Sequence, residues 1–357
     1  MNRELVAAAP GKLEWRDGKE PLPKEGRVVV RPVYGAIKHG TEFSMVSGKA
    51  YLRGPWDAQM GLHEKPSPGA AALSGGGPAP GDFREAAVGN MVAGVVEEDR
   101  TGTFAPGEWV YGYSPFGHRV AVPPGRLWRL EDRKRWKSLV CLDPARFALG
   151  AVRDGGLRLG DRVAVFGLGA IGLLAVQMAR LAGAALIVGL DPVTARRDAA
   201  AALGADLVLD PRQGDPGREL KRACGGQGPD VVIDFSGTAA ALQQVLRGVA
   251  FGGTVVCAAF PAPFPAGLDF GAEAHMNRPQ IVFSRAGSDP SRDHPRWSGG
   301  RIEEECRRLL EEGRLDGSLI VDRVVPYDEL KAAFLDVMND PAAAIKLGVV
   351  FPGGEET

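Results

Sequence analysis

The pattern of hydrophobic and polar residues along this chain changes near residue 150. Before that point, short apolar runs rich in Val, Ile and aromatic residues are broken by Gly and Pro. This pattern predicts strands at 27–37, 91–98, 109–113 and 118–123. Short strands with such breaks are typical of a compact, mostly antiparallel, barrel-like domain.

From residue 150 onward, apolar strands alternate with segments of helical periodicity. The pattern predicts strands at 162–169, 185–191, 206–210, 230–237, 253–260 and 280–285, and helices at 170–182, 194–203 and 239–250. This alternation is typical of a doubly wound parallel sheet, as in a Rossmann domain. The C-terminal region predicts helices at 302–312 and 327–339 and strands at 319–326 and 344–351.

One segment of the first part predicts no regular structure. Residues 66–82, PSPGAAALSGGGPAPGD, consist mainly of Gly, Pro and Ala. Because Gly and Pro interrupt both helices and strands, we expect a long surface loop there.

Composition and charge exclude several classes of function. The chain of 357 residues is 45% hydrophobic and has a net charge of -1, which disfavours nucleic acids and acidic membranes as partners. No apolar run approaches the ~20 residues of a spanning helix. The N-terminal segment MNRELVAAAPGKLEW has only a brief apolar patch, shorter than a signal peptide needs. We therefore expect a cytoplasmic protein.

A glycine motif opens the second part of the chain. Val163–Phe166 predicts a buried strand, and Gly167, Gly169 and Gly172 then give the spacing G-x-G-x-x-G before an apolar helix. The glycines allow a tight turn and a close approach of the backbone to a pyrophosphate, which faces the N-terminus of the helix. The order strand, loop, helix, strand and acid predicts a dinucleotide site. Its expected contacts are Gly167, Gly169, Ala170, Ile171, Gly172, Asp191, Arg196 and Ser236.

The acid of this motif bears on the choice of cofactor. Asp191 follows the second strand, where a carboxylate can accept hydrogen bonds from both ribose hydroxyls. A 2'-phosphate would meet its negative charge, so NAD is favoured over NADP. Arg196 and Arg197 keep NADP open as an alternative, because arginines in this position can hold a 2'-phosphate. They can also form a solvated helix face or pack beside the adenine.

Over nearly its whole length the chain resembles the medium-chain dehydrogenase/reductase superfamily, the zinc alcohol dehydrogenase-like fold. The matching segments are PGEWVYGY (106–113), LRLGDRVAVFGLGAIG (157–172), LGADLVLD (203–210), DVVIDFSG (230–237) and GGTVV (252–256). The resemblance implies an α/β enzyme that transfers hydride, with a GroES-like β-barrel catalytic domain at 1–150, completed by 290–357, and a Rossmann domain at 151–289. It also implies a homodimer that pairs through the strand at 280–285.

The chain departs from the zinc-dependent members of this superfamily. Where they carry Gly-His-Glu-x-x-Gly, the aligned segment has Asn90 and Met91, and their catalytic cysteine becomes Lys38. An ammonium is not a zinc ligand, and amide and thioether groups are weak ones for this metal. We therefore expect no catalytic zinc. An alternative set of metal ligands would be His39, Glu42, His63 and Glu64.

The four cysteines give no further support for a metal. Cys141, Cys224, Cys257 and Cys306 are widely spaced and form no Cys-x-x-Cys pair. The superfamily's second, structural zinc uses four closely spaced cysteines, and these are missing here. Neither a zinc ribbon nor a disulfide framework is predicted.

Without zinc, another group must act on the substrate oxygen when hydride leaves a carbinol carbon. We expect Lys38 to take the place of the metal, to pair with Asp143 in CLDPARFALGAV, and to serve as hydrogen-bond donor and proton carrier. The alternative is a salt bridge that only fills the vacated metal site. His39 is the rival proton carrier, because an imidazole titrates near neutral pH.

The segment that follows Lys38 resembles a zinc-poor branch of the superfamily, which includes bacteriochlorophyllide dehydrogenases and several sugar or cyclitol dehydrogenases. Thr41 could then relay a proton through the ribose. Glu42 could bind a substrate hydroxyl or cap a helix.

A second polar cluster lies between Glu273 and Trp297. With Glu42 and Asn90, we expect it to line a site for a polyol or sugar ring through hydrogen bonds and stacking. Its candidate residues are His275, Asn277, Arg285, His294 and Trp297, each of which could instead belong to a surface loop.

These observations predict an NAD-dependent, zinc-independent dehydrogenase of secondary alcohols on a polyol, cyclitol or sugar-like substrate. A zinc-free reductase of quinones or enones that uses NADPH is the enzymatic alternative, against which Asp191 argues. A catalytically silent NAD-binding protein is the alternative from another class.

Overall fold

The computed structural model describes residues 2–21, 26–48, 56–63, 85–261, 263–264, 267–285, 288–290 and 293–354. The expected loop at 66–82 and the candidate ligand Glu64 lie outside these residues. The chain divides into two compact units, Met1–Trp136 with Val321–Thr357 (unit 1) and Lys137–Ile320 (unit 2). No helix within the described ranges is long and apolar enough to cross a membrane.

The two units differ from the expected domains at their boundaries. The expected first domain includes residues 137–150 and 290–320, whereas the structure groups these residues with unit 2. The reason is helix packing, because α3 (Leu142–Asp154) packs against both α4 (Ala170–Leu181) and α9 (Gly299–Glu311). Each of these helices therefore extends the Rossmann-like part of the chain.

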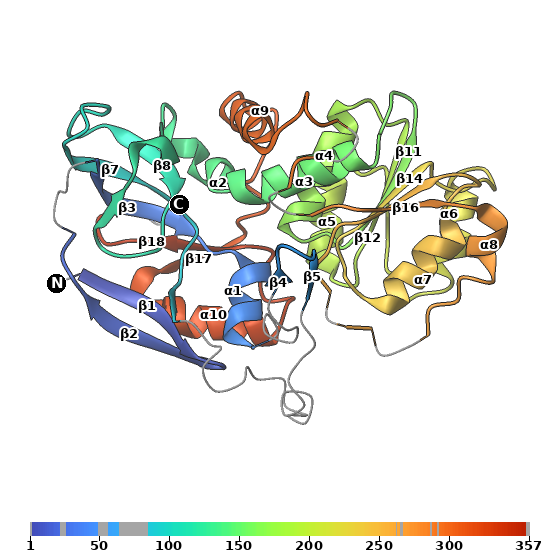
Figure 1. The fold of residues 1–357 in the computed structure, drawn as a ribbon, viewed down its shortest axis with the longest axis horizontal. Coiled ribbons are helices and arrows are strands. Elements are labelled where there is room, and N and C mark those ends of the chain that lie inside the picture. Colours follow the sequence, from blue (N-terminus) through green and yellow to red (C-terminus); the bar gives the residue numbers. More distant parts are fainter. Residues whose placement is uncertain are drawn as a thin grey trace. The chain divides into compact units, whose positions relative to one another are not determined.

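Unit 1 contains two main sheets (Figure 1). One has the order β2-β1-β6, and the other has the order β10-β8-β7-β3-β18-β17, with β9 paired to β3. The strands are β1 (Asn2–Ala9), β2 (Lys12–Gly18), β3 (Val28–Ala36), β6 (Ala86–Ala87), β7 (Met91–Asp99), β8 (Trp109–Tyr113), β9 (Val120–Val122), β10 (Leu127–Arg129), β17 (Arg323–Pro326) and β18 (Leu347–Val350). Pairing is antiparallel except between β17 and β18. The predicted antiparallel β domain is confirmed.

Shorter elements complete unit 1. They are α1 (His39–Val46), β4 (Trp56–Asp57), β5 (Leu62–His63), α10 (Leu330–Asn339) and the short helical turns at Pro124–Arg126, Arg133–Arg135 and Tyr327–Glu329; α2 (Trp136–Leu139) spans the boundary. Buried aromatic side chains pack between the sheets and α10, among them Phe116, Tyr327, Phe334 and Phe351. This core fixes the start of α1 against β18.

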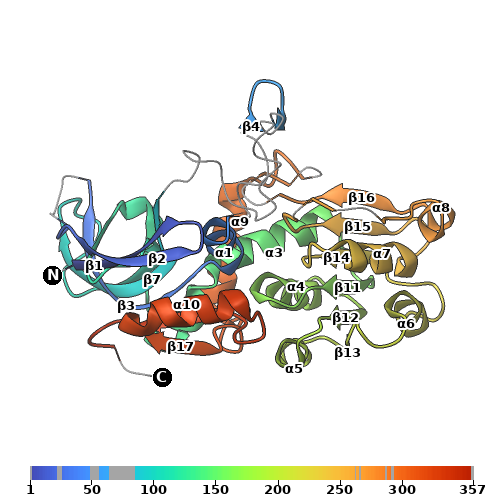
Figure 2. The same cartoon turned by 90° about the horizontal axis from the view of Figure 1, so that it is seen from below.

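Unit 2 is built on a parallel sheet with the strand order β13-β12-β11-β14-β15-β16 (Figure 2). Its strands are β11 (Arg162–Phe166), β12 (Leu186–Leu190), β13 (Leu207–Leu209), β14 (Val231–Asp234), β15 (Thr254–Cys257) and β16 (Gln280–Phe283). Its other helices are α5 (Thr194–Ala202), α6 (Pro216–Ala223), α7 (Ala239–Gly248) and α8 (Glu273–Asn277). Figure 2 shows α4 and α5 on one side of the sheet and α6 and α7 on the other, so the predicted doubly wound sheet is confirmed.

Candidate functional site

The glycine loop of unit 2 connects β11 to α4 at the carboxyl edge of the sheet. Gly167 has a positive φ of 85°, which favours glycine. A Cβ atom on Gly172 would lie 1.9 Å from the carbonyl oxygen of Gly167, so only glycine lets α4 start this close to the strand. A Cβ atom on Gly167 would lie 2.9 Å from the backbone nitrogen of Ser236. The loop therefore places Ser236 beside the first glycine.

Gly169 differs from the other two glycines because its position faces open space. A Cβ atom there would meet no other atom within 4 Å, and the φ of Gly169 is an ordinary -69°. This residue is the N-cap of α4, which has no side-chain cap and no acidic residue in its first turn. The first N–H groups of a helix lack partners inside the helix and attract anions. The loop therefore fits a dinucleotide pyrophosphate at Gly169, Ala170 and Ile171.

Asp191 follows β12 directly and lies next to the glycine loop. Its Oδ2 atom accepts a hydrogen bond from the N–H of Leu168 at 2.9 Å, and its Oδ1 atom accepts one from the N–H of Val193 at 2.8 Å. Only 2% of Asp191 is exposed, and Nη1 of Arg196 lies 3.5 Å from Oδ2. A carboxylate has about four acceptor positions, and the two backbone N–H groups fix the orientation of this one beside the glycine loop.

The two arginines after Asp191 have different contacts. Arg197 donates to the backbone oxygen of Asp191 at 2.7 Å and forms an ion pair with Asp210 at 3.5 Å. Arg196 instead approaches the Asp191 carboxylate itself. Arg196 therefore places a positive charge beside Asp191, the acid that we expect to bind the ribose hydroxyls.

Ser236 follows β14 on the same edge of the sheet. Its hydroxyl donates to Oδ1 of Asp234 at 2.6 Å. Asp234 is 4% exposed, and burial raises the pKa of its carboxyl, although the hydrogen bonds from Ser236 oppose the rise. The structure thus brings Gly167, Asp191 and Ser236 together, as the dinucleotide motif predicts.

Replacing Gly169 with Ala tests whether a pyrophosphate uses the open space at this residue. We expect the Gly169→Ala variant to fold like the unmodified protein, because the new methyl group meets nothing in the chain. Its affinity for NADH should fall at least about tenfold, since the methyl group takes the space that the phosphate needs. NADH fluorescence titration measures the effect, with Gly150→Ala on α3 as the matched control at another open glycine. Unchanged NADH affinity in Gly169→Ala would contradict the placement.

Lys38 and His39 begin α1 in unit 1. Lys38 is the N-cap of the helix and is partly buried. His39 accepts a hydrogen bond at Nε2 from the N–H of Leu347, at 2.9 Å, and its ring lies 4.7 Å from that of Phe43. The Nε2 atom of His39 is therefore occupied by a backbone N–H of β18.

Glu42 lies in the first turns of α1, and Thr41 before it is exposed. The Glu42 carboxylate accepts hydrogen bonds from the N–H of Gly89, at 3.0 Å, and from the backbone of Lys38. Burial raises the pKa of Glu42 to about 7, although these hydrogen bonds and the charges of Lys346 and Lys38 oppose the rise. Its Oε2 atom is buried and has no hydrogen-bond partner in the described ranges. Glu42 therefore caps α1 through one carboxyl oxygen, and its Oε2 atom can accept a hydrogen bond from another group.

Lys346 is a buried residue of this region that the sequence reasoning missed. It is 3% exposed, and its Nζ atom donates to the backbone oxygen of Ile37 at 2.6 Å. Its charge also acts on Glu42. The only signal in the sequence is one lysine within the apolar run AIKLGVVF. Lys346 thus adds a fixed positive charge behind the start of α1.

Asn90 and Met91 occupy the positions expected for zinc ligands. Met91 is fully buried at the start of β7, and Nδ2 of Asn90 is buried without a hydrogen-bond partner among the residues described. In those residues, no three His, Cys, Asp or Glu side chains come together as a metal site would require. Amide and thioether groups beside a lysine are a poor donor set for zinc.

Asp143, the expected partner of Lys38, belongs to unit 2. It lies in the first turn of α3 and is 6% exposed. Since Lys38 belongs to unit 1, the pairing of the two side chains stays a prediction.

The structure disperses the residues of the second polar cluster. His275 and Asn277 lie on α8, before β16, at the amino edge of the sheet, whereas Arg285 follows β16 at the carboxyl edge. The Nε2 atom of His294 lies 3.4 Å from Oδ2 of Asp289. Trp297 packs under the guanidinium of Arg153, which lies 3.7 Å from the ring centre. His275 and Asn277 therefore lie at the opposite edge of the sheet from Arg285.

Comparisons with known proteins agree with this geometry. A family model described as zinc-binding dehydrogenase matches residues 170–296. D-guloside 3-dehydrogenase of Escherichia coli (strain K12) is 40% identical over 98% of this chain and 100% of its own length. Two solved structures share the fold over 98% of this chain and 99% of theirs. They are ECK1772, an oxidoreductase/dehydrogenase of unknown specificity from Escherichia coli (TM-score 0.76, 18% identity), and alcohol dehydrogenase TADH from Thermus sp. ATN1 (TM-score 0.68, 22% identity).

The relative that is 40% identical covers nearly every residue of both units. A nicotinamide dinucleotide is the cofactor typical of the matching family, and the glycine loop of unit 2 fits such a molecule. The chain therefore belongs to the zinc-binding dehydrogenase family of the medium-chain dehydrogenase/reductase superfamily, and it is a dehydrogenase that acts on CH–OH groups.

Proposed function

We propose that the protein is an NAD-dependent, zinc-independent dehydrogenase that interconverts a secondary alcohol and a ketone on a sugar-like substrate. The observation that carries the proposal is the polar cluster at the start of α1. Two buried polar atoms in neighbouring segments, Oε2 of Glu42 and Nδ2 of Asn90, lack partners within the described chain. Gly89, which precedes Asn90, binds the Glu42 carboxylate. Buried polar atoms without partners are rare, and substrate hydroxyls would satisfy both.

The substrate class follows from the chemistry of this cluster together with the relatives. A carboxyl oxygen that accepts and an amide that donates are the groups that hold hydroxyls of a sugar ring. The relative named D-guloside 3-dehydrogenase matches 98% of the chain, which supports a glycoside or a similar sugar as substrate.

The reaction divides between the bound cofactor and the chain. A nicotinamide dinucleotide, which the glycine loop, Asp191 and Ser236 would hold, would supply the hydride acceptor. The chain's own residues must take the hydroxyl proton and hold the substrate oxygen. We assign this role to Lys38, paired with Asp143, with Thr41 as a relay and His39 as the rival proton carrier. We also expect a cytoplasmic homodimer that pairs through β16, the edge strand of the sheet, whose Phe283 is 79% exposed.

A substrate screen tests this function. A D-guloside, other sugars, cyclitols and simple alcohols are offered with NAD or NADP, with and without a metal chelator, and reduced nucleotide is followed by fluorescence. We expect oxidation of a glycoside or sugar with NAD, unchanged by the chelator. Loss of activity on chelation would overturn zinc independence, and a strong preference for NADP would overturn the role of Asp191. NADH binding without turnover on the whole panel would favour a silent NAD-binding protein.

A further inference from the structure

Asp210 is a carboxylate at the edge of the parallel sheet to which the proposed reaction assigns no role. It follows β13 directly, as Asp191 follows β12, and the two strands pair in parallel with Leu190 opposite Leu209. The N–H of Asp191 also donates to the backbone oxygen of Leu209 at 3.3 Å. Asp210 therefore lies next to the residue that we expect to bind the ribose hydroxyls, at the carboxyl edge where such sheets bind their ligands.

Two arginines converge on the Asp210 carboxylate. Arg212 donates to Oδ1 from Nε at 3.0 Å and to Oδ2 from Nη2 at 2.7 Å, and Nη1 of Arg197 lies 3.5 Å from Oδ2. The side chain of Asp210 is only 7% exposed, and the hydrogen bonds from Arg212 lower the pKa of its carboxyl to about 2. Asp210 is therefore a fixed negative charge at neutral pH that two guanidinium groups share.

The same two guanidinium groups bind the backbone that carries the Asp191 side chain. Arg197 donates to the backbone oxygen of Asp191 at 2.7 Å, and Arg212 donates to that of Pro192 at 2.6 Å. Carbonyl groups beyond the end of a strand have no ladder partner, so they need other donors to hold them. One carboxylate, Asp210, thus holds two arginines that hold consecutive carbonyl groups of the segment after β12.

We propose that Asp210 is a positioning residue for the nicotinamide dinucleotide. Through Arg197 and Arg212 it fixes the backbone of Asp191 and Pro192, and so holds the Asp191 carboxylate where the ribose hydroxyls bind. Such support matters because a binding group must stay within about 0.5 Å of its productive geometry. The inference rests on the proposed use of this cofactor, and Asp210 acts through Asp191 rather than on the cofactor itself.

The Asp210→Asn variant tests this role in an NADH fluorescence titration of the full chain. Asparagine has the same shape but no charge with which to hold two guanidinium groups. We expect the dissociation constant of NADH to rise at least about fivefold. Arg212→Gln, at a side chain that is 67% exposed, removes one of the two arms and should raise it at least about threefold.

A double-mutant cycle with Asp191→Ala separates positioning from a general loss of stability. A residue that acts through Asp191 has nothing left to position once that carboxylate is gone. Asp210→Asn should therefore weaken NADH binding no further in the Asp191→Ala background, whereas effects of independent origin would add.

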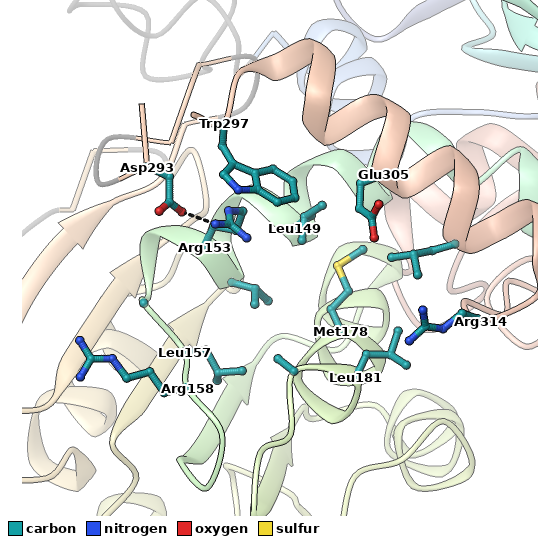
Figure 3. A pocket seen from close by; sticks show the side chains of 14 residues that line it. Leu149, Arg153, Leu157, Arg158, Met178, Leu181, Asp293, Trp297, Glu305 and Arg314 are labelled. Atoms are coloured by element: carbon teal, nitrogen blue, oxygen red, sulfur yellow. Dashed lines mark ion pairs between the residues drawn. The ribbon is translucent and has the colours of Figure 1, made fainter. Parts of the chain in front are cut away.

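Two other aspartates of unit 2 provide matched controls. Asp206, at the amino end of β13, accepts a hydrogen bond from the N–H of Ile187 at 2.7 Å and pairs with Arg180 at 2.6 Å. Asp293 pairs with Arg153 at 2.8 Å in a cavity of about 590 Å³ that is lined by α3, α9 and the end of α4 opposite to the glycine loop (Figure 3). Asp206→Asn and Asp293→Asn each break a pair of the same kind away from the ribose position, so both should bind NADH like the unmodified protein.

Three results would overturn the role of Asp210. They are unchanged NADH affinity in both Asp210→Asn and Arg212→Gln, an equal loss of affinity in Asp206→Asn, and a loss in Asp210→Asn that is the same with and without the Asp191 carboxylate. Each of them leaves the proposed cofactor in place, because the unmodified protein still binds NADH. If the unmodified protein binds no NADH, the proposed function is wrong and the inference falls with it.

Discussion

The Lys38→Met variant should lose sugar oxidation almost completely while it binds NADH as the unmodified protein does. Methionine has a similar length but has no proton to give and no charge, so the substrate oxygen loses its donor. Removing a general acid or base costs about 10²–10⁴-fold in rate. NADH binding should be kept, because the glycine loop and Asp191 belong to unit 2 and Lys38 belongs to unit 1. Steady-state kcat and an NADH fluorescence titration measure the two effects.

Two further variants separate the possible roles of Lys38. Lys38→Arg keeps the positive charge, but a guanidinium does not give up its proton in proteins. If Lys38 carries the proton, this variant is nearly as inactive as Lys38→Met; if Lys38 only donates a hydrogen bond, it recovers much of the rate. Lys12→Met is the control at an exposed lysine of β2. Retention of more than about a tenth of kcat in Lys38→Met would show that the lysine only fills space.

The periodicity of apolar residues predicted most of the fold correctly, and its failures have local causes. The expected strand 319–326 begins only at Arg323. Asp322 accepts hydrogen bonds at Oδ1 from the N–H groups of Ile345 and Lys346, so the residues before it form a turn despite their apolar character. Strands β1 and β2 were missed, because NRELVAAA and KLEWRDG mix charged and apolar residues without strict alternation.

The geometry of the glycine loop was predictable because its parts are adjacent in sequence. A strand, a glycine loop and a helix fix one another, and Asp191 follows on the neighbouring strand. The region around α1 was less predictable. Lys346 binds the backbone of Ile37, more than 300 residues away, and no local pattern indicates such a pair.

In the second polar cluster, by contrast, residues that are close in sequence lie apart in the structure. His275 and Arg285 are close in sequence, and the prediction treated them as one group. The strand between them, β16, places them at opposite edges of the sheet. Proximity in sequence indicates a shared site only when no strand or helix separates the residues.

The Glu42→Gln variant should remove a large pH dependence of the stability of unit 1. The pKa of Glu42 is raised from 4.5 to about 7 by burial, so between these values the folded chain holds a proton that the unfolded chain has lost. Stability from this group is therefore complete below about pH 4.5 and is lost as the pH rises through about 7. A pKa difference of this size corresponds to about 3 kcal/mol. Glutamine stays neutral and can still accept the hydrogen bond from Gly89, so the variant avoids the loss.

Urea denaturation between pH 4 and pH 8.5 measures this effect, with tryptophan fluorescence as the signal. Of the six tryptophans, only Trp297 belongs to unit 2, so the fluorescence reports chiefly on the unit that contains Glu42. The variant should match the unmodified protein near pH 4 and exceed its free energy of unfolding by about 3 kcal/mol at pH 8.5. Glu131→Gln, at an exposed carboxylate of the same unit, should show no such divergence. If the two curves for Glu42→Gln and the unmodified protein stay parallel across this range, the carboxyl is already ionised in the folded protein near neutral pH, and burial does not hold a proton on it.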